Sequence, residues 1–399
     1  MTNKTIVTLP GDGIGKTVLD SALRVLDAAG FEANYVEADI GWEFWRSEGD
    51  PLPERTLDLI AEHKIALFGA ITSKPKDEAF EELAPELKSS GAIYSSPIVG
   101  LRQHFGLDIC LRPCHSYLGN PLNFIRRGVD GKLEEPAVDV AIFRQNTEGL
   151  YGGVEWSGPP KDVHDAFMTH PKFKQNFGGT PVEELSISTR IFTKKATERI
   201  LRAAFEHARK NGYTSVTVCE KPNVIRETSG MMYKMAQELQ KADFSDIELW
   251  NTNIDAQMMW LTKNPENYGV IVAGNMFGDI ASDGFAGLIG GLGFAASAQY
   301  NPDTGVGVFE PTHGSAPKYA DYETSIVNPI AMIEAACMML DFIDEQNIAI
   351  KIRKAVANVI EAGEVRTYDM ARLPGNADVI QKGAASTEEM TAAIIGKLT

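Results

Sequence analysis

The chain has 399 residues, of which 44% are hydrophobic and 23% are charged, a composition typical of a globular protein with roughly two or three domains. Its 38 Lys and Arg residues are outnumbered by 54 Asp and Glu residues, which gives a formal net charge of −16. Nucleic acid and anionic membranes both select clustered Lys and Arg, so neither is expected as a partner, whereas a local basic pocket for an anionic metabolite is compatible with this charge. No run of about eighteen apolar residues predicts a membrane span, and the first residues lack a secretory signal. With four scattered cysteines, we expect a reduced, cytoplasmic protein.

Short apolar runs alternate with helically periodic stretches along most of the chain. The expected strands and extended stretches are residues 5–9, 33–36, 65–68, 138–143, 215–219, 247–250 and 268–272. The expected helices are residues 15–30, 53–62, 194–210, 227–241, 329–345 and 348–362, and a further helix begins near Phe277. Such alternation predicts an open α/β sheet.

Residues 151–190 interrupt this alternation. They are rich in Gly, Pro, His and charged residues and show no clear periodicity. A structureless loop of this length is uncommon inside a compact domain, so we expect an arm or clasp with some structure of its own.

A glycine-rich turn, Gly11-Asp12-Gly13, lies between the first apolar run and the first expected helix. The P-loop that binds nucleotide phosphates needs a glycine where this chain has Pro10, and the dinucleotide-binding fingerprint needs one where it has Lys16. A phosphotransferase would therefore rest on an incomplete motif. Two interpretations stay open: a tight strand-to-helix turn that needs glycine for positive φ, and direct contact with a ligand.

Two aspartates, Asp279 and Asp283, lie near the start of an apolar helix, about one turn apart and on the same face. Like charges this close repel unless a cation lies between them, and Mg²⁺ commonly binds one or two carboxylates together with substrate oxygens. The helix macrodipole also favours acids at a helix N-terminus, which accounts for Asp279 better than for Asp283. Asp255 also follows a strand and could complete a site. The pattern favours metal binding.

Three arginines and a tyrosine are candidates for binding an anionic substrate. Arg102 and Arg112 flank the segment GLDICL, and Arg144 ends an apolar run shortly before Tyr151. Guanidinium groups bind carboxylates through paired hydrogen bonds, so three that converge would suit a di- or tricarboxylate, although a single arginine is more often a solvated surface residue. Lys221 directly follows a strand; it is either a base with a lowered pKa or, as these residues alone favour, a solvated lysine.

Six motifs occur in order across nearly the whole chain: LPGDGIG, LRQHFGLDICLRP, FRQNTEGLYGGVEW, GNMFGDIASD, GGLGFA and EPTHGSAPKYA. Together they resemble the isocitrate and isopropylmalate family of decarboxylating dehydrogenases. The resemblance implies a two-domain α/β fold with a mixed sheet and without a classical Rossmann motif, so the glycine turn need not match either fingerprint. It implies a large cofactor-binding domain (1–107 and 290–399) and a small substrate and dimerisation domain (108–289) with a clasp-like arm (151–190). Such subunits form homodimers in which each active site is shared between the two chains.

The resemblance also implies roles for single residues. The substrate carboxylates would be bound by Ser96, Arg102, Arg112 and Arg144. Tyr151 would protonate the enolate after CO₂ leaves, and Lys221 of the partner subunit would assist removal of the hydroxyl proton. Mg²⁺ or Mn²⁺ would be held by Asp279, Asp283 and Asp255 of the partner subunit.

The motif after HGSAP bears on the choice of cofactor. NAD enzymes of the family have Asp-Ile there, whereas this chain has Lys318-Tyr319, as in enzymes that bind the 2′-phosphate of NADP. A cation and a phenol suit a dianionic phosphate. The resemblance therefore implies NADP, with NAD as the alternative. The residues expected to bind the cofactor are Thr72, His313, Gly314, Lys318, Tyr319, Asn328, Tyr368 and Arg372.

The resemblance implies a small anionic hydroxy acid as the substrate, and the motif IFRQNTEG resembles the isocitrate and homoisocitrate enzymes. Where isocitrate enzymes present Ser-x-Asn to the distal carboxylate, this chain has Ser96-Pro97-Ile98, and Ile98 resembles the apolar pocket of isopropylmalate enzymes. We expect oxidative decarboxylation of isocitrate to 2-oxoglutarate. The alternatives are a 3-isopropylmalate or homoisocitrate dehydrogenase and a non-catalytic regulatory subunit; such subunits generally lose an active-site arginine, the tyrosine or a metal-binding aspartate, all of which are present here.

Overall fold

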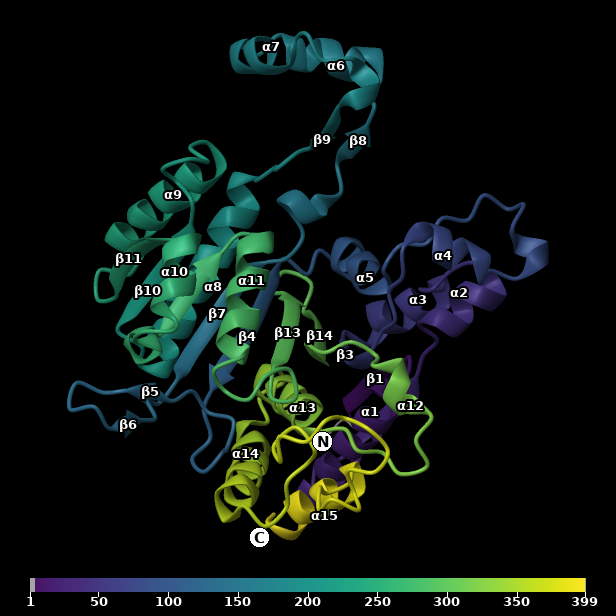
Figure 1. Cartoon of the computed structure of the whole chain (residues 1–399), viewed down its shortest axis with the longest axis vertical. Helices are drawn as coiled ribbons and strands as arrows, with labels where there is room; N and C mark the ends of the chain where they lie inside the picture. The colour runs from purple at the N-terminus through teal and green to yellow at the C-terminus, as the bar shows by residue number, and fades with distance from the viewer. Residues whose placement is uncertain (1–3, 399) are drawn as a thin grey trace.

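The computed structural model describes residues 4–398, and ten strands of this part of the chain form one sheet across the molecule (Figure 1). These strands are β1 (Lys4–Gly11), β2 (Ala33–Glu37), β3 (Ile65–Ala70), β4 (Ile109–His115), β7 (Asp139–Gln145), β10 (Ser215–Glu220), β11 (Glu248–Asn253), β12 (Val270–Ala273), β13 (Ala296–Asn301) and β14 (Val306–Pro311). The spatial order is β11-β10-β12-β7-β4-β13-β14-β3-β1-β2.

The sheet is mixed, as the family resemblance implies. The strands β11, β10, β12 and β7 are parallel, as are β14, β3, β1 and β2. Between these halves, β4 is antiparallel to β7, and β13 is antiparallel to both β4 and β14. The described chain joins β13 to β4 through three residue pairs, Ala298–Leu111, Gln299–Cys110 and Tyr300–Ile109.

Helices cover both sheet faces and both ends (Figure 1). They are α1 (Gly15–Ala29), α2 (Trp42–Glu48), α3 (Glu54–His63), α4 (Lys76–Glu81), α5 (Pro97–Phe105), α6 (Lys161–Met168), α7 (Pro171–Phe177), α8 (Lys194–Asn211), α9 (Thr228–Asp243), α10 (Ile254–Trp260), α11 (Asn275–Ala286), α12 (Pro317–Ala320), α13 (Ile330–Phe342), α14 (Gln346–Ala362) and α15 (Thr387–Gly396). Each expected strand and helix has a counterpart within a few residues. Strands β4, β13 and β14 were not expected from the periodicity.

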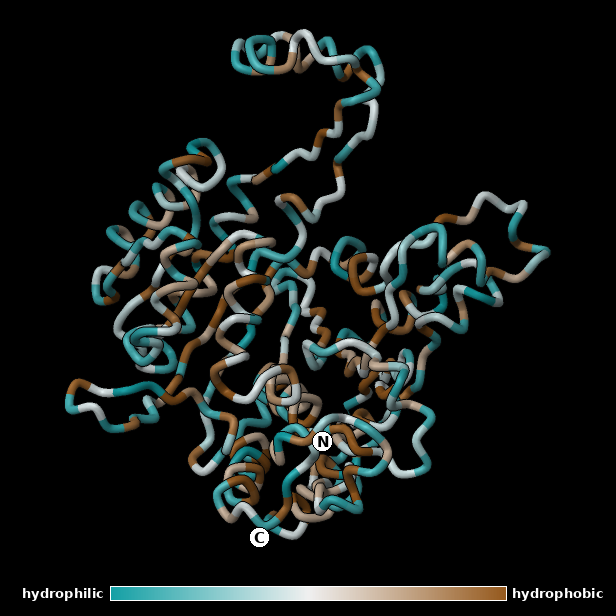
Figure 2. Tube along the Cα trace, in the orientation of Figure 1, coloured by the Kyte–Doolittle hydropathy of each residue, from teal (hydrophilic) through white to brown (hydrophobic). Residues whose placement is uncertain are grey.

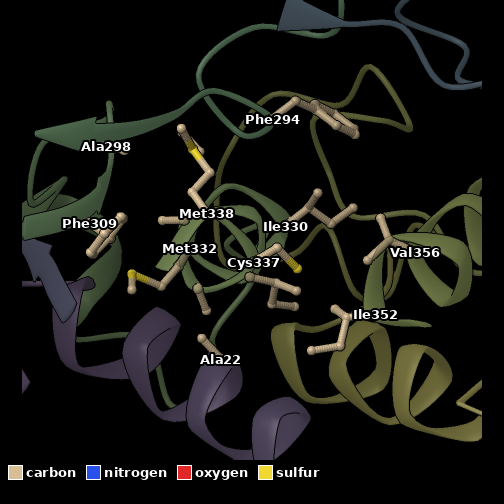
Figure 3. Packing of buried hydrophobic residues seen from close by; sticks show 14 of the residues in the cluster. Ala22, Phe294, Ala298, Phe309, Ile330, Met332, Cys337, Met338, Ile352 and Val356 are labelled. Atoms are coloured by element: carbon tan, nitrogen blue, oxygen red, sulfur yellow. The ribbon is translucent and has the colours of Figure 1, made fainter. Parts of the chain in front are cut away.

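The largest core forms around α13, a helix that is apolar on nearly every face and is buried accordingly. In Figure 3, Met332 and Cys337 of this helix lie among side chains from the sheet and from two other helices. Ala22 of α1 and Ile352 of α14 are buried in the same cluster. Figure 2 shows hydrophobic residues concentrated along the central strands, whereas the outer helices alternate hydrophobic and hydrophilic positions.

Residues 151–190 do form an arm with its own structure, as expected. The short strands β8 (Glu155–Ser157) and β9 (Ser186–Ser188) pair antiparallel and lead to the helices α6 and α7. Figure 1 shows this helix pair projecting away from the main body of the subunit. A smaller hairpin, β5 (Arg126–Arg127) and β6 (Leu133–Glu134), projects elsewhere. Between residues 4 and 398, no helix has the length and apolar character needed to cross a membrane.

Candidate active site

The glycine-rich turn connects β1 to α1, and its geometry shows the steric need for glycine that was one of the two interpretations of the sequence. Gly11 has φ of 67°, and a Cβ there would lie 1.9 Å from the carbonyl oxygen of Ala70. The turn therefore needs glycine for steric reasons. Asp12 accepts hydrogen bonds from the backbone N–H groups of Trp42 and Thr72, each at 2.7 Å. Its role in this structure is to hold the segment after β3, including the expected cofactor residue Thr72, against the turn.

The register of β4 and β7 brings two of the expected substrate arginines together. Arg144 lies opposite Cys110, and Arg112 lies two residues further along β4. Because side chains alternate between the faces of a sheet, Arg112 and Arg144 project from the same face. Leu111 and Phe143 face the other side and pack in the core with α8.

Asp279 lies between these two guanidinium groups. Arg112 donates to Asp279 Oδ1 at 3.0 Å and to Ser282 Oγ at 2.8 Å, and Arg144 also donates to Asp279 Oδ1. The Nε of Arg144 donates to Asn275 Oδ1 at 2.9 Å. Burial and the nearby charge of Arg112 lower the pKa of Arg144 to about 10. The carboxylate of Asp279 is therefore the counter-charge of a buried arginine pair.

Helix α11 presents Asp279 and Asp283 on one face, as the spacing predicts. The helix lies close to β7 because residue 278 is glycine; a Cβ there would lie 2.8 Å from Cβ of Arg144. The two carboxylates differ in environment: the Asp279 side chain is 30% exposed, whereas that of Asp283 is 59% exposed and approaches Arg112 at 3.4 Å. Burial, opposed by Arg112, raises the pKa of Asp283.

Tyr151 joins the same cluster from a short 3₁₀ turn, Leu150–Gly152. Its hydroxyl donates to Asp279 Oδ2 at 3.3 Å, and the Arg144 guanidinium carbon lies 5.5 Å from its ring centroid. Burial and the negative charge of Asp279 raise the pKa of Tyr151, which keeps the phenol protonated. The geometry fits a proton donor at the edge of an arginine and carboxylate cluster.

Lys221 and Asp255 form an ion pair with each other where β10 ends and α10 begins. In residues 4–398, no hydrogen bond or ion pair connects either residue to the Asp279 cluster. The same part of the chain contains no group of three or more His, Cys, Asp or Glu side chains that could hold a metal ion. Two hard carboxylates on one helix face fit a divalent cation that takes its remaining ligands from substrate, water or another subunit.

Arg102 lies on α5, and it meets buried polar groups of the central hairpin. Its Nε donates to Gln299 Oε1 at 2.6 Å, and its guanidinium lies 3.7 Å from Glu310 Oε1. Burial raises the pKa of Glu310. Ser96 is the N-cap residue of α5, and its side chain makes no cap hydrogen bond there.

A cavity of about 580 Å³ joins the expected substrate and cofactor residues. Ile98, Arg102 and Arg112 line it together with Thr72 and the loop 312–317, which contains His313 and Gly314. Thr72 Oγ1 lies 2.6 Å from the hydroxyl of Ser315 in this loop. His313 Nε2 is buried and has no hydrogen-bond partner in the described chain, and burial lowers the pKa of His313. A neutral imidazole with a free nitrogen fits a cavity that binds a polar ligand such as NAD(P).

Of the residues expected to bind the 2′-phosphate of the cofactor, Lys318, Tyr319 and Tyr368 lie close together, whereas Arg372 makes a different contact. Lys318 Nζ lies 4.5 Å from the ring centroid of Tyr319, and the rings of Tyr319 and Tyr368 are 5.6 Å apart. Although burial acts in the opposite direction, hydrogen bonds from Lys318 and Tyr368 lower the pKa of Tyr319. Arg372 instead donates to the Pro121 carbonyl at 2.6 Å.

Asn328, another expected cofactor residue, is buried and committed to structural contacts. Its Nδ2 donates to Asp369 Oδ2 at 3.1 Å, and its Oδ1 accepts from the backbone N–H of Ile330 at 3.0 Å. These contacts hold the start of α13 to the segment that carries Tyr368. Asn328 therefore supports this part of the site in the present structure.

Several residues of the site were not singled out in the sequence. They are Asp12, Asn275, Ser282, Gln299, Ser315 and Glu310. Most of them lie inside or beside the quoted motifs, so adjacency to a motif was the available signal. Their partners could not be read from the chain, because each contact crosses between elements that are distant in sequence.

The chain belongs to the isocitrate/isopropylmalate dehydrogenase family, whose model matches residues 5–394. It is 38% identical over 392 residues to the protein DlpA of Legionella pneumophila subsp. pneumophila, covering 98% of this chain and 58% of that protein. The chain thus spans little more than half the length of that relative. It is 36% identical to an isocitrate/homoisocitrate dehydrogenase of Thermus thermophilus, over 98% of each chain.

The crystal structure of isocitrate dehydrogenase from Methylococcus capsulatus is similar to this fold, with a TM-score of 0.80, 33% sequence identity and 99% of each chain covered. The two-domain α/β expectation with a large mixed sheet is thereby confirmed. The family consists of decarboxylating dehydrogenases of hydroxy acids that generally use NAD(P) and a divalent metal. The chain is accordingly a member of an enzyme family.

Proposed function

We propose that this protein catalyses the NADP- and metal-dependent oxidative decarboxylation of isocitrate to 2-oxoglutarate and CO₂. The observation that carries the proposal is the convergence of Arg112, Arg144 and Tyr151 on Asp279. Arg112 also lines the cavity that contains Thr72 and the loop 312–317. A site for an anionic acid thus adjoins a site suited to a nicotinamide cofactor.

Substrate binding rests on the arginines. Isocitrate carries three carboxylates, and Arg102, Arg112 and Arg144 are each held by neutral or acidic partners that fix the orientation of the guanidinium group. Fixed guanidinium groups lose little freedom when they bind a carboxylate, which favours tight and oriented binding. Orientation matters because the C–H bond that loses the hydride must face the nicotinamide, while the carboxylate that leaves as CO₂ must lie beside Tyr151, the acid that then protonates the carbon.

Proton transfers are assigned to two side chains. When bound, NADP⁺ accepts the hydride and the divalent ion withdraws electrons from the substrate as a Lewis acid. Lys221 assists removal of the hydroxyl proton, so that the carbinol becomes a ketone. After the C–C bond to the carboxylate breaks and CO₂ leaves, Tyr151 donates its phenolic proton to the enolate carbon. Asp279 and Asp283 hold the metal on the α11 face.

We further propose that two chains share each site. Lys221 and Asp255 form an ion pair with each other, and in the described chain no hydrogen bond or ion pair connects either of them to Asp279. This arrangement fits two residues that contribute to the active site of a partner subunit. The small domain (108–289), with the arm (151–190), would mediate this pairing, and the large domain would comprise 1–107 and 290–399. Residues 1–3 and 399 of this assignment lie outside the described chain.

NADP is the proposed cofactor, with NAD as the alternative. The exposed ammonium of Lys318 lies beside the phenols of Tyr319 and Tyr368. A cation and two hydroxyl donors suit a dianionic 2′-phosphate, whereas they offer no acceptor for the 2′-hydroxyl of NAD comparable to a carboxylate.

A second candidate is a homoisocitrate or 3-isopropylmalate dehydrogenase. The observation that favours it is Ile98, which lines the cavity beside Arg102 where an amide would be expected for isocitrate. The catalytic groups are the same in both cases.

A substrate panel tests the proposal. The protein, with Mg²⁺ or Mn²⁺, is mixed with isocitrate, homoisocitrate or 3-isopropylmalate and with NADP⁺ or NAD⁺, and the reduced cofactor is followed by absorbance. We expect the highest kcat/KM for isocitrate with NADP⁺. A strong signal with another acid and none with isocitrate would refute the substrate assignment.

A further inference from the structure

Lys74 is a cation of the active-site cavity to which none of the roles above is assigned. It follows Thr72 and precedes α4, and it lines the same cavity as Ile98, Arg102 and Arg112. We propose that Lys74 is a specificity-determining residue that binds the distal carboxylate of the substrate substituent. This assignment rests on the proposed function, since it concerns the same site.

The position of Lys74 is fixed by an aromatic support. Its Nζ lies 5.0 Å from the ring centroid of Trp42 and forms an ion pair with Glu82. Trp42 Nε1 donates to Glu82 Oε2 at 2.6 Å, so the three side chains form one unit. Trp42 packs against Tyr94 with ring centroids 5.1 Å apart, and Tyr94 donates to the Thr72 carbonyl at 2.8 Å. These contacts hold the Lys74 ammonium beside the cavity and connect its support to the segment that carries Thr72.

The cationic side chains that line the cavity differ in how strongly neighbouring side chains of the protein bind them. Arg102 is bonded to Gln299 and lies near the buried Glu310, and Arg112 is bonded to Asp279 and Ser282. The carboxylate partner of Lys74, in contrast, belongs to a Glu82 side chain that is 38% exposed. An exposed ion pair contributes little to stability, so exchanging Glu82 for a substrate carboxylate costs little. Lys74 is therefore the cavity cation most easily released to a ligand.

Ile98, which lines the same cavity, helps to define which substrate substituents Lys74 would accept. Ile98 supplies apolar surface for the methylene groups of a substituent, and Lys74 supplies a charge for its end. A carboxymethyl or carboxyethyl substituent, as in isocitrate or homoisocitrate, satisfies both. An isopropyl group would contact Ile98 but would desolvate the ammonium without replacing its partner. Lys74 thus selects a tricarboxylic over a branched apolar substrate.

The first test compares Lys74→Met with Lys88→Met. Lys88 is a matched control, because it belongs to the same segment, lies 5.7 Å from the Phe80 ring centroid and donates to the Glu81 carbonyl at 2.9 Å. Steady-state kinetics use isocitrate, homoisocitrate, 3-isopropylmalate and malate, which lacks the substituent. Lys74→Met should lower kcat/KM for isocitrate about 10- to 100-fold, mainly through KM, which is the usual loss for one charged hydrogen bond. Its activity on malate and the activities of Lys88→Met should stay within about twofold of wild type.

A second variant separates substrate binding from a purely structural latch. Glu82→Gln breaks the same ion pair but leaves the ammonium in place, so it should keep or lower the KM for isocitrate. If Lys74 only fastened the segment, Glu82→Gln and Lys74→Met would impair all substrates alike, and the assignment would be wrong. A raised KM for NADP⁺ with an unchanged KM for isocitrate in Lys74→Met would also overturn it, since the lysine would then bind the cofactor.

The outcomes distinguish this assignment from the proposed function. Wild-type preference for isocitrate that survives in Lys74→Met overturns the role of Lys74 and leaves the function standing. Wild-type preference for homoisocitrate over malate that is lost in Lys74→Met corrects the substrate and supports Lys74. A wild-type protein that turns over none of the four acids, or favours 3-isopropylmalate, overturns both.

Discussion

Asp279 and Asp283 would be equivalent if both were simply metal ligands, and the structure predicts that they are not. Asp279 lies between the guanidinium groups of Arg112 and Arg144 and has a side chain that is 30% exposed. Removing one partner from a buried ion pair costs about 3–5 kcal/mol, and partial exposure reduces this, so Asp279→Asn should lower the free energy of unfolding by about 2 kcal/mol. Asp283 is 59% exposed and 3.4 Å from Arg112, and burial raises its pKa, so Asp283→Asn should leave the free energy of unfolding within about 0.5 kcal/mol of wild type.

The measurement is urea unfolding in EDTA, followed by tryptophan fluorescence and circular dichroism, so that no metal contributes to stability. Binding of Mn²⁺ to the folded variants is measured separately by calorimetry, and both substitutions should weaken it. Equal losses of stability in the two variants, or a larger loss in Asp283→Asn, would show that Asp279 is not the counter-charge of the arginine pair. Unchanged Mn²⁺ affinity in both would refute the metal site.

Three further predictions concern sharing of the site, cofactor choice and pH. If each site combines Tyr151 of one chain with Lys221 of the other, homodimers of Tyr151→Phe and homodimers of Lys221→Met are both inactive. After the two variants are mixed and re-associated, about a quarter of wild-type activity should return, because half of the dimers are hybrids and each hybrid has one intact site of two. No recovery of activity would place both residues in one chain's site. Lys318→Asp combined with Tyr319→Ile should shift kcat/KM toward NAD⁺, and an unchanged ratio would contradict the phosphate assignment. Burial lowers the pKa of His207 to about 4, so below about pH 6.5 the unfolded chain binds a proton at this residue and the folded chain does not. The free energy of unfolding should therefore fall by up to about 3 kcal/mol as the pH decreases from 6.5 toward 4. His207→Gln should flatten that part of the profile of unfolding midpoint against pH, and an unaltered slope would speak against it.

The helices α1, α3, α8, α9, α11, α13 and α14 and most outer strands could be predicted because their periodicity is local, whereas the other helices, most of them short, were not predicted. The central strand β13 could not, since its residues Ser297, Gln299 and Asn301 are polar although they are buried. The structure supplies the reason for Gln299: it accepts a hydrogen bond from Arg102 and donates to Glu310. The residues of β13 alternate between apolar and polar, which is typical of a strand with one exposed face, so the pattern could not reveal a central strand that is buried on both faces.

In the candidate site, too, some features could be predicted from local sequence and others could not. The shared face of Asp279 and Asp283 follows from helical spacing and was predictable. The convergence of Arg112 and Arg144 depends on the register of two antiparallel strands that are far apart in the chain, and no local pattern encodes that register. The resemblance to a family named these residues, but their mutual contacts became visible with the fold.

The two parallel halves of the sheet are joined at its middle through the antiparallel strands β4 and β13. Backbone ladders resist sliding, because a slip of one residue turns every side chain to the opposite face, whereas strand twist can vary gradually. Arg112 and Arg144 stand on one side of the three-pair connection between β4 and β13, and Thr72 and His313 stand beyond it. We expect a relative movement of the two sides to be a twist at this connection, which would change the separation between Arg112 and Arg144 on one side and the cofactor loop on the other.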